Sequence, residues 1–333
     1  MIFDPAIITL VLLSLLTAGF SVYASTLGYR ILQYWDIESG SGRQLTLERQ
    51  TYLVSSVLNH LFAIGILSIF FFIYTVDRIH PLFIGAMCAA GALNVNQYGY
   101  PTLFIKIAAV ILSGLWLILN HTDNRCPDYP LIRTKYRLLM AVAAVSVLDA
   151  YLLVQYFLHM KTDVITACCG IIFNEDAAAV SGKIAAMPSM PAKVLFYLCM
   201  ALVVGSGLRF RRTGRMAKTF SFFSILAFLV SLASIISFIS LYFYELPTHH
   251  CPFCLLQKEY HYIGYPLYIS LFTACITGLG VGVLEQVGGP ESLEKPLTTV
   301  QQALCCTAMT GFLIFTVIAT APMLFSDFTL EGY

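Results

Sequence analysis

Long apolar stretches are the feature of this 333-residue chain that most constrains its fold. A helix needs roughly 20 mainly apolar residues to cross the roughly 30 Å hydrocarbon core of a bilayer. Hydrophobic residues make up 58% of the chain and charged residues 11%, far from an average soluble domain. The sequence therefore predicts an all-α, polytopic protein in the lipid bilayer. Its expected spans are 7–32, 51–76, 101–120, 135–159, 191–209, 219–244, 262–284 and 301–325.

Two further segments refine this topology. The N-terminus lacks the basic leader of a signal peptide, so we expect its apolar run to be the first span. The segment HPLFIGAMCAAGALN at 80–94 is too short to cross and is predicted to be a re-entrant or interfacial helix. The whole chain, 1–333, is expected to form a single membrane domain. Two halves, 1–208 and 219–333, could be joined by the basic linker at 209–218.

Lysines and arginines near the helix ends indicate the orientation, because cytoplasmic loops carry the excess of these residues. Thirteen of them lie in one set of loops and five in the other, with Lys106 inside a span. We therefore expect a multi-pass protein of the bacterial inner membrane with both termini outside the cytoplasm. The outer side then holds CPFC (251–254), TACCG (166–170) and the short segment with Cys88. The chain has no basic block or Arg-rich face of the kind that a phosphate backbone requires, so no nucleic-acid partner is expected.

The stretch THHCPFCLLQKEY at 248–260 contains the main candidate site. A Cys-x-x-Cys pair at a helix start, here Cys251 and Cys254, places both sulfurs near the positive end of the helix dipole, which lowers the thiol pKa. The thiolate is the species that attacks a disulfide or binds a metal. Outside the cytoplasm the pair could instead persist as a static disulfide that fixes the loop.

A second cysteine pair, Cys168 and Cys169, is predicted on the same side. A disulfide between adjacent cysteines closes a small, strained ring, so each is expected to find its partner elsewhere. One interpretation is exchange with the CPFC pair, and the other is a structural bridge to Cys88. Cysteines inside the spans are expected to be packing residues, and Cys126 a reduced loop thiol.

Histidines beside CPFC support an alternative interpretation. Neutral imidazole and thiolate together suit zinc or copper, which makes His249, His250 and His261 candidate metal ligands. No second Cys-x-x-Cys or His-x-x-x-His completes a familiar tetrahedral set. Under this alternative the protein is a transporter or a membrane subunit of a larger complex, in which the cluster binds metal or holds loops together.

Polar residues inside the spans are costly and often functional. His60 could hydrogen-bond a quinone, ligate a haem or bond to a neighbouring helix; no second histidine at its depth is apparent, so a haem is not expected. Lys106 and Asp149 lie about 8 and 15 Å below the outer ends of consecutive spans, and the lysine stem could bridge them. Such a pair could serve a proton or ligand path, or be purely structural.

The residues CPFCLLQK at 251–258 resemble the Cys-x-x-Cys-x-x-Gln-Arg stretch of DsbB-like disulfide-generating membrane oxidoreductases, and more loosely the thiol site of vitamin K epoxide reductase homologues. The resemblance covers under a dozen residues. It implies that Cys251 and Cys254 lie next to a quinone whose head contacts Gln257 and Lys258. Lys258 replaces the usual Arg and cannot form the same guanidinium fork. Those families have a four-helix core, whereas eight spans are expected here.

These features together predict a thiol-disulfide redox protein acting at the non-cytoplasmic face. In this hypothesis Cys251 is attacked or oxidised, Cys254 resolves, and Cys168 and Cys169 relay electrons. The expected partners are a membrane quinone and a periplasmic thiol protein.

Overall fold

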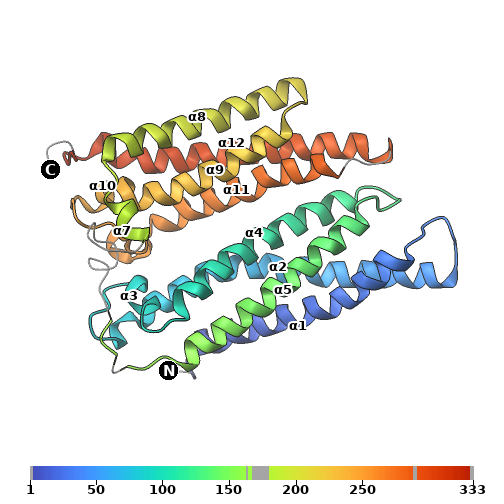
Figure 1. Ribbon diagram of the computed structural model, residues 1–333, viewed down its shortest axis with the longest axis horizontal. Coiled ribbons are helices and arrows are strands. Elements are labelled where there is room, and N and C mark those ends of the chain that lie inside the picture. Colours follow the sequence, from blue (N-terminus) through green and yellow to red (C-terminus); the bar gives the residue numbers. More distant parts are fainter. Residues whose placement is uncertain (1–2, 163, 167–179, 288–290, 331–333) are drawn as a thin grey trace. The chain divides into compact units, whose positions relative to one another are not determined.

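The computed structural model describes residues 3–162, 164–166, 180–287 and 291–330. Within that part of the chain, eight helices are long and apolar enough to cross a membrane (Figure 1). This confirms the predicted all-α membrane fold and its number of spans. The same residues contain no strand, only an isolated parallel bridge between Ile84 and Ile165.

The described residues form the following helical elements. In chain order they are α1 (Pro5–Tyr34), α2 (Gly42–Ile79), the 3-10 turn η1 (His80–Leu82), α3 (Ala89–Leu93), α4 (Gly99–Asp123), α5 (Ile132–Leu158), α7 (Val180–Ala185), α8 (Ser189–Thr213), α9 (Ala217–Ser234), the π-helical turn η2 (Ile235–Ile239), α10 (Ser240–Tyr244), the 3-10 turns η3 (Cys254–Leu256) and η4 (Lys258–Tyr260), α11 (Gly264–Gln286) and α12 (Glu291–Phe325).

Several helices extend beyond the apolar stretches that predicted them. The stretch at 51–76 becomes part of α2, which begins at Gly42, and the stretch at 301–325 becomes part of α12, which begins at Glu291. An apolar window marks only the part of a helix that hydrocarbon can surround, and a helix can continue into the polar interface. The predicted short helix at 80–94 is reduced to η1, a loop and the five residues of α3.

The chain divides into two compact units, each described by itself. Unit 1 comprises Met1–Phe72, Gln97–Met160 and Val283–Gln302, and unit 2 comprises Ile73–Asn96, Lys161–Gly282 and Ala303–Tyr333. The predicted halves, 1–208 and 219–333, are continuous stretches of the chain, whereas each unit combines three separate stretches. The division into halves stays a prediction.

Close helix packing organises the core of unit 1. Helix α1 lies against α5, and a Cβ at Gly28 would come within 2.8 Å of the Tyr136 ring. Phe62 and Trp116 meet edge to face, with ring centroids 5.1 Å apart. Since lipid provides no hydrophobic drive for helices to associate, such contacts between small residues and rings hold the bundle together.

In unit 2, close packing at small residues likewise joins α9 and α11. Gly278 and Gly282 form a Gly-x-x-x-Gly pattern, and a Cβ at either position would come within 2.5 Å of a side-chain atom of Ser224 or Ser221. Only hydrogen at these two positions lets the helix backbones approach so closely. The close approach positions the ends of α10 and α11, between which CPFC lies.

Candidate functional site

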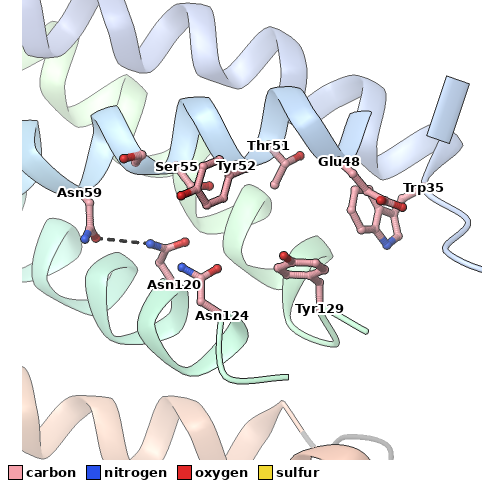
Figure 2. Close-up of a pocket in the computed structure, with 10 residues that line it drawn as sticks. Trp35, Glu48, Thr51, Tyr52, Ser55, Asn59, Asn120, Asn124 and Tyr129 are labelled. Atoms are coloured by element: carbon pink, nitrogen blue, oxygen red, sulfur yellow. Dashed lines mark hydrogen bonds between the residues drawn. The ribbon is translucent and has the colours of Figure 1, made fainter. Parts of the chain in front are cut away.

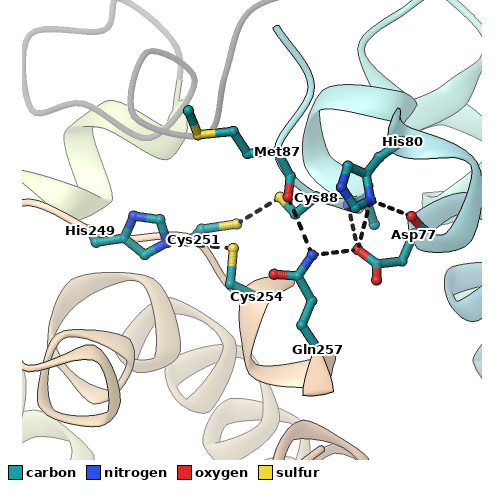
Figure 3. Close-up of polar contacts among 9 residues, drawn as sticks. Asp77, His80, Met87, Cys88, His249, Cys251, Cys254 and Gln257 are labelled. Carbon is teal, nitrogen blue, oxygen red and sulfur yellow. Dashed lines mark hydrogen bonds and ion pairs between the residues drawn. The ribbon is translucent and has the colours of Figure 1, made fainter. Parts of the chain in front are cut away.

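Three cysteines from two distant segments meet in unit 2 (Figure 3). The Sγ atoms of Cys88 and Cys251 are 3.5 Å apart. Together with Cys254, the three sulfurs lie within 4.8 Å of one another. All three residues are buried, with exposed fractions of 0%, 1% and 4%. The predicted placement of Cys88 on the same side as CPFC is thus confirmed as direct contact.

Cys88 is held in place by the turn that precedes α3. It is the residue before the first helical turn, and its carbonyl accepts a hydrogen bond from the amide of Ala92. Upstream, Gly85 has a φ of +88°, and a Cβ there would lie 2.6 Å from the carbonyl oxygen of Thr166. The Thr166 hydroxyl donates to the carbonyl of Gly91 at 2.8 Å. The segment around Cys88 is therefore fastened to Thr166, the first residue of TACCG.

Two tyrosine hydroxyls hold the CPFC backbone. Tyr244, at the end of α10, donates to the carbonyl oxygen of Cys251 at 2.5 Å. Tyr268, in α11, donates to the carbonyl oxygen of Pro252 at 2.7 Å. Bonds to successive carbonyls fix the direction in which the Cys251 side chain leaves the loop.

The sequence predicts CPFC at a helix start, and the helix that begins there is only a short 3-10 turn. Cys254 begins η3, which has only three residues, and α11 starts at Gly264. Gln257 is extended, with φ −84° and ψ 160°, and His261 and Tyr262 have positive φ. These conformations interrupt the helix, so the dipole of a long helix does not act on the two thiols.

One of the three predicted histidines contacts the sulfurs. His249 Nε2 lies 3.4 Å from Cys254 Sγ, and its ring meets Tyr244 edge-on at 4.6 Å. His250 hydrogen-bonds through Nδ1 to the carbonyl of Ile236, in the π-helical turn. His261 is exposed in a left-handed turn. The structure thus distinguishes a sulfur-contacting histidine from one bonded to a carbonyl and one on the surface.

Gln257 links the CPFC loop to the segment that carries Cys88. Its Nε2 donates to Asp77 Oδ1 at 3.0 Å and to the carbonyl of Met87 at 3.3 Å. Asp77 Oδ1 also accepts from the amide of Ala89, at 3.0 Å (Figure 3). The carboxylate therefore joins the residues on either side of the sulfur cluster.

A cavity of about 480 Å³ opens beside this link. Gln257 and Lys258, the two residues predicted to contact a quinone head, both line it. Met87 and Leu256 also line it, and they adjoin Cys88 and CPFC in the chain. A cavity of this size is within the range of small-molecule sites.

The remaining predicted site residues lie elsewhere. His60 is exposed on α2 in unit 1, and its Nδ1 contacts the carbonyl of Ser56 in its own helix at 2.8 Å, rather than a neighbouring helix. Cys168 and Cys169 lie outside the described residues. Burial raises the pKa of the Cys126 thiol, and the Asp128 and Asp123 carboxylates add to the rise, so little thiolate forms there at neutral pH.

Sequence reasoning missed the residues that hold the site together. Asp77 was not singled out because it ends a long apolar helix and nothing in its spacing relates it to Gln257, 180 positions later. Tyr244 and Tyr268 resemble ordinary interfacial aromatics in the sequence. Only the contacts identify them as anchors of CPFC.

Unit 1 contains two buried Lys–Asp pairs and a polar cavity. Lys106 Nζ lies 3.0 Å from Asp149 Oδ2, which confirms that the lysine stem spans the predicted difference in depth. Lys135 Nζ lies 2.7 Å from Asp123 Oδ2. Figure 2 shows the cavity, of about 140 Å³, where Asn120 donates to Asn59 at 3.3 Å.

No known family model, curated protein or solved structure matches this chain. The likeness of CPFCLLQK to DsbB-like enzymes rests on those residues alone. Function has to be argued from the geometry.

Proposed function

We propose that this is a membrane thiol-disulfide redox protein in which Cys88, Cys251 and Cys254 form the electron-carrying centre. The observation that carries the proposal is the meeting of three sulfurs within 4.8 Å, from positions 163 residues apart. Exchange requires a thiolate to approach a disulfide sulfur directly. In this cluster Cys251 lies near two other sulfurs, so a disulfide could pass between Cys251–Cys254 and Cys88–Cys251.

The reaction balances with two electrons and two protons. A substrate thiolate attacks Cys251 in a Cys251–Cys254 disulfide, and Cys254 leaves as a thiolate next to His249. A second substrate thiol displaces Cys251, which completes the substrate disulfide and leaves a Cys251–Cys254 dithiol. A quinone that accepts two electrons and two protons becomes quinol and restores the disulfide.

His249 is suited to assist the leaving sulfur. At 3.4 Å its Nε2 can donate to a Cys254 thiolate, and charge-assisted hydrogen bonds are stronger than neutral ones. The T-shaped contact with the Tyr244 ring limits its rotation. In this proposal His249 stabilises the thiolate form of Cys254 during exchange.

The 480 Å³ cavity supports a quinone as the electron acceptor. Gln257 and Lys258 line its wall, and Lys258 contributes a positive charge there. All three thiols are buried, which suits a small carrier in this cavity as the electron acceptor. A periplasmic thiol protein, the inner-membrane location and the orientation with both termini outside belong to the same proposal.

A second function is favoured by a specific observation, the contact of His249 Nε2 with Cys254 Sγ beside the cluster of three sulfurs. A tetrahedral zinc with Zn–S bonds of about 2.3 Å has its sulfurs about 3.8 Å apart, similar to the spacing here. A Cys₃His set is a known type of structural zinc site. Under this alternative the cluster binds zinc or copper in a transporter or in a subunit of a larger complex.

One experiment separates the two functions. Purified full-length protein is analysed for bound metal while folded. It is then denatured and alkylated with and without a phosphine reductant, and the labelled cysteines are mapped by mass spectrometry. For the redox function, Cys251 and Cys254 become reactive only with the reductant. For the metal function, metal analysis finds one zinc or copper per chain, and both cysteines react without the reductant because unfolding releases the metal.

Matched variants show which residues are responsible for the metal binding or for the thiol exchange. The metal function predicts that His249→Ala lowers the metal content at least tenfold, whereas His261→Ala, an exposed histidine of the same loop, does not change it. The redox function predicts that Cys254→Ala accumulates a mixed disulfide on Cys251. Normal membrane insertion with neither a protected thiol nor a bound metal would rule out both functions.

A further inference from the structure

The Lys106–Asp149 pair in unit 1 is buried within two spanning helices, α4 and α5. Lys106 Nζ contacts Asp149 Oδ2 at 3.0 Å, and the two side chains are 4% and 11% exposed. Charges at such positions are expensive, and they are retained either as a structural pair or for transport of protons or ions. The surroundings of the Asp149 carboxylate distinguish a structural pair from a site for proton or ion transport.

The carboxylate of Asp149 is only half satisfied by protein. Among the residues that the structure describes, none donates a hydrogen bond to its buried Oδ1 atom. Leaving a buried acceptor without a donor is costly, and more so for a charged group. A second donor is therefore expected at Oδ1, and protein atoms do not supply it.

A small cavity lies at this carboxylate. Its volume is about 30 Å³, and it is lined by both charged residues and by hydroxyls from four helices. One water molecule needs about 10 to 15 Å³ on this measure, so the cavity has room for about two. The hydroxyls come from Ser14, Thr17, Ser68, Ser113 and Ser146.

The lining offers mainly acceptors to whatever occupies the cavity. The hydroxyls of Ser14, Thr17 and Ser68 donate to carbonyls of their own helices, at 3.0, 2.8 and 2.6 Å. Their oxygen lone pairs remain for an occupant, as does Asp149 Oδ1. A cavity lined mainly by hydrogen-bond acceptors favours molecules that donate hydrogen bonds, such as water and protonated water.

The ammonium group has a second partner if the carboxylate becomes neutral. Lys106 Nζ lies 5.6 Å from the centroid of the Phe72 ring, within cation–π range. No residue other than Lys106 and Asp149 titrates among those that line the cavity from α1, α2, α4 and α5 in the described structure. A change of charge at this site is therefore confined to one carboxyl and one amine.

We propose that this cavity is a hydrated proton-exchange site within the membrane. A proton from cavity water binds Asp149 Oδ1, and the carboxylate becomes a carboxylic acid. Lys106 keeps its charge and turns from the carboxylate toward water and the Phe72 ring. Loss of the same proton restores the ion pair. The site binds one proton per cycle and does not depend on the thiol chemistry of unit 2.

Infrared difference spectroscopy on the full-length protein in lipid nanodiscs tests this site. We expect acidification to produce a carbonyl band of a protonated carboxylic acid, shifted in D₂O because the site exchanges with water. The band should disappear in Asp149→Asn. It should be unchanged in the control Asp36→Asn, an exposed loop carboxyl of the same unit.

Lys106→Met provides a second measurement that does not require Asp149 to be replaced. Without the neighbouring cation, the midpoint of the band should move to higher pH by about one unit or more. A band that persists in Asp149→Asn, a midpoint that Lys106→Met leaves unchanged, or a wild-type spectrum without an exchangeable band would each overturn the proposal. The last of these results would indicate a permanently ionised, structural pair.

Discussion

The two Lys–Asp pairs of unit 1 use identical side chains in different surroundings. Lys135 donates to Asp123 Oδ2 and to Asn120 Oδ1, at 2.7 and 3.2 Å, and Asp123 Oδ1 accepts from the amide of Leu131 at 2.9 Å. Both side chains are 0% exposed. Every carboxylate oxygen of this pair thus has a protein donor, whereas Asp149 Oδ1 faces a small polar cavity.

The difference teaches how to tell a structural ion pair from a site that can change its charge. A complete network has one stable arrangement, because removing a charged member leaves the other charge buried and unpaired. Asp123 and Leu131 also bracket the turn between α4 and α5, so their network fixes that connection. A pair that faces a hydrated cavity has an alternative arrangement available, since water can replace a missing protein partner.

The largest effect should come from breaking the complete pair. Lys135→Met leaves the Asp123 carboxylate buried without its cation, and we expect the free energy of unfolding to fall by about 3 to 5 kcal/mol. Thermal or denaturant unfolding in detergent micelles measures the change. The double variant Lys135→Met, Asp123→Leu serves as the control and should recover most of the loss. A single variant no less stable than the double variant would contradict the structural role.

A smaller effect is expected at the hydrated pair. Asp149→Asn leaves Lys106 with cavity water and the Phe72 ring, so the free energy of unfolding should fall by only about 1 to 2 kcal/mol. The same unfolding assay allows direct comparison with Lys135→Met. Equal losses at the two sites would remove the distinction between them.

A smaller loss of stability is expected at Asn120, a polar neighbour of the Lys135–Asp123 pair. Asn120→Ala removes an acceptor from Lys135 and a donor to Asn59, and should cost about 1 kcal/mol. The unfolding assay measures the loss, and Asn124→Ala, at the wall of the 140 Å³ cavity, is the matched control. Losses of the same size in both variants would show that Asn120 does not act through the ion pair.

The smallest effect on stability should come from the hydroxyls of the hydrated cavity. Ser113→Ala removes one polar group from a site where water can rearrange, so the free energy of unfolding should change by less than about 0.5 kcal/mol. The infrared band of Asp149 should nevertheless shift in frequency, because its hydrogen bonding changes. An unaltered band would separate Ser113 from the proton site.

Much of the fold could be predicted from the sequence because a bilayer imposes a simple rule. Any run of about 20 apolar residues has to satisfy its backbone hydrogen bonds internally, and a helix does so regardless of its neighbours. The eight spans were therefore predictable, while their ends were not. Lys135 was counted as a loop cation, yet it is completely buried, because its partner Asp123 lies in the preceding helix.

The candidate site was predictable only in part, because sequence patterns describe local structure and the site depends on contacts between distant residues. Local spacing identifies Cys251 and Cys254 as a pair at a helix start, but it does not reveal that this helix is a three-residue 3-10 turn. Side-chain identity makes His249 and His250 equivalent candidates. The contact of His249 with Cys254 depends on the turn between α10 and α11, which no pattern of apolar residues describes.

By itself the sequence determined that this chain is an all-helical membrane protein with cysteine and histidine chemistry concentrated in one loop, because these properties depend on residue type and local order. Only the tertiary structure decided that Cys88 joins Cys251 and Cys254, that Asp77 joins Gln257, and that one Lys–Asp pair is complete while the other faces a cavity. Contacts between residues far apart in the chain depend on how helices pack, and helix packing is set by the complementary shapes of whole surfaces.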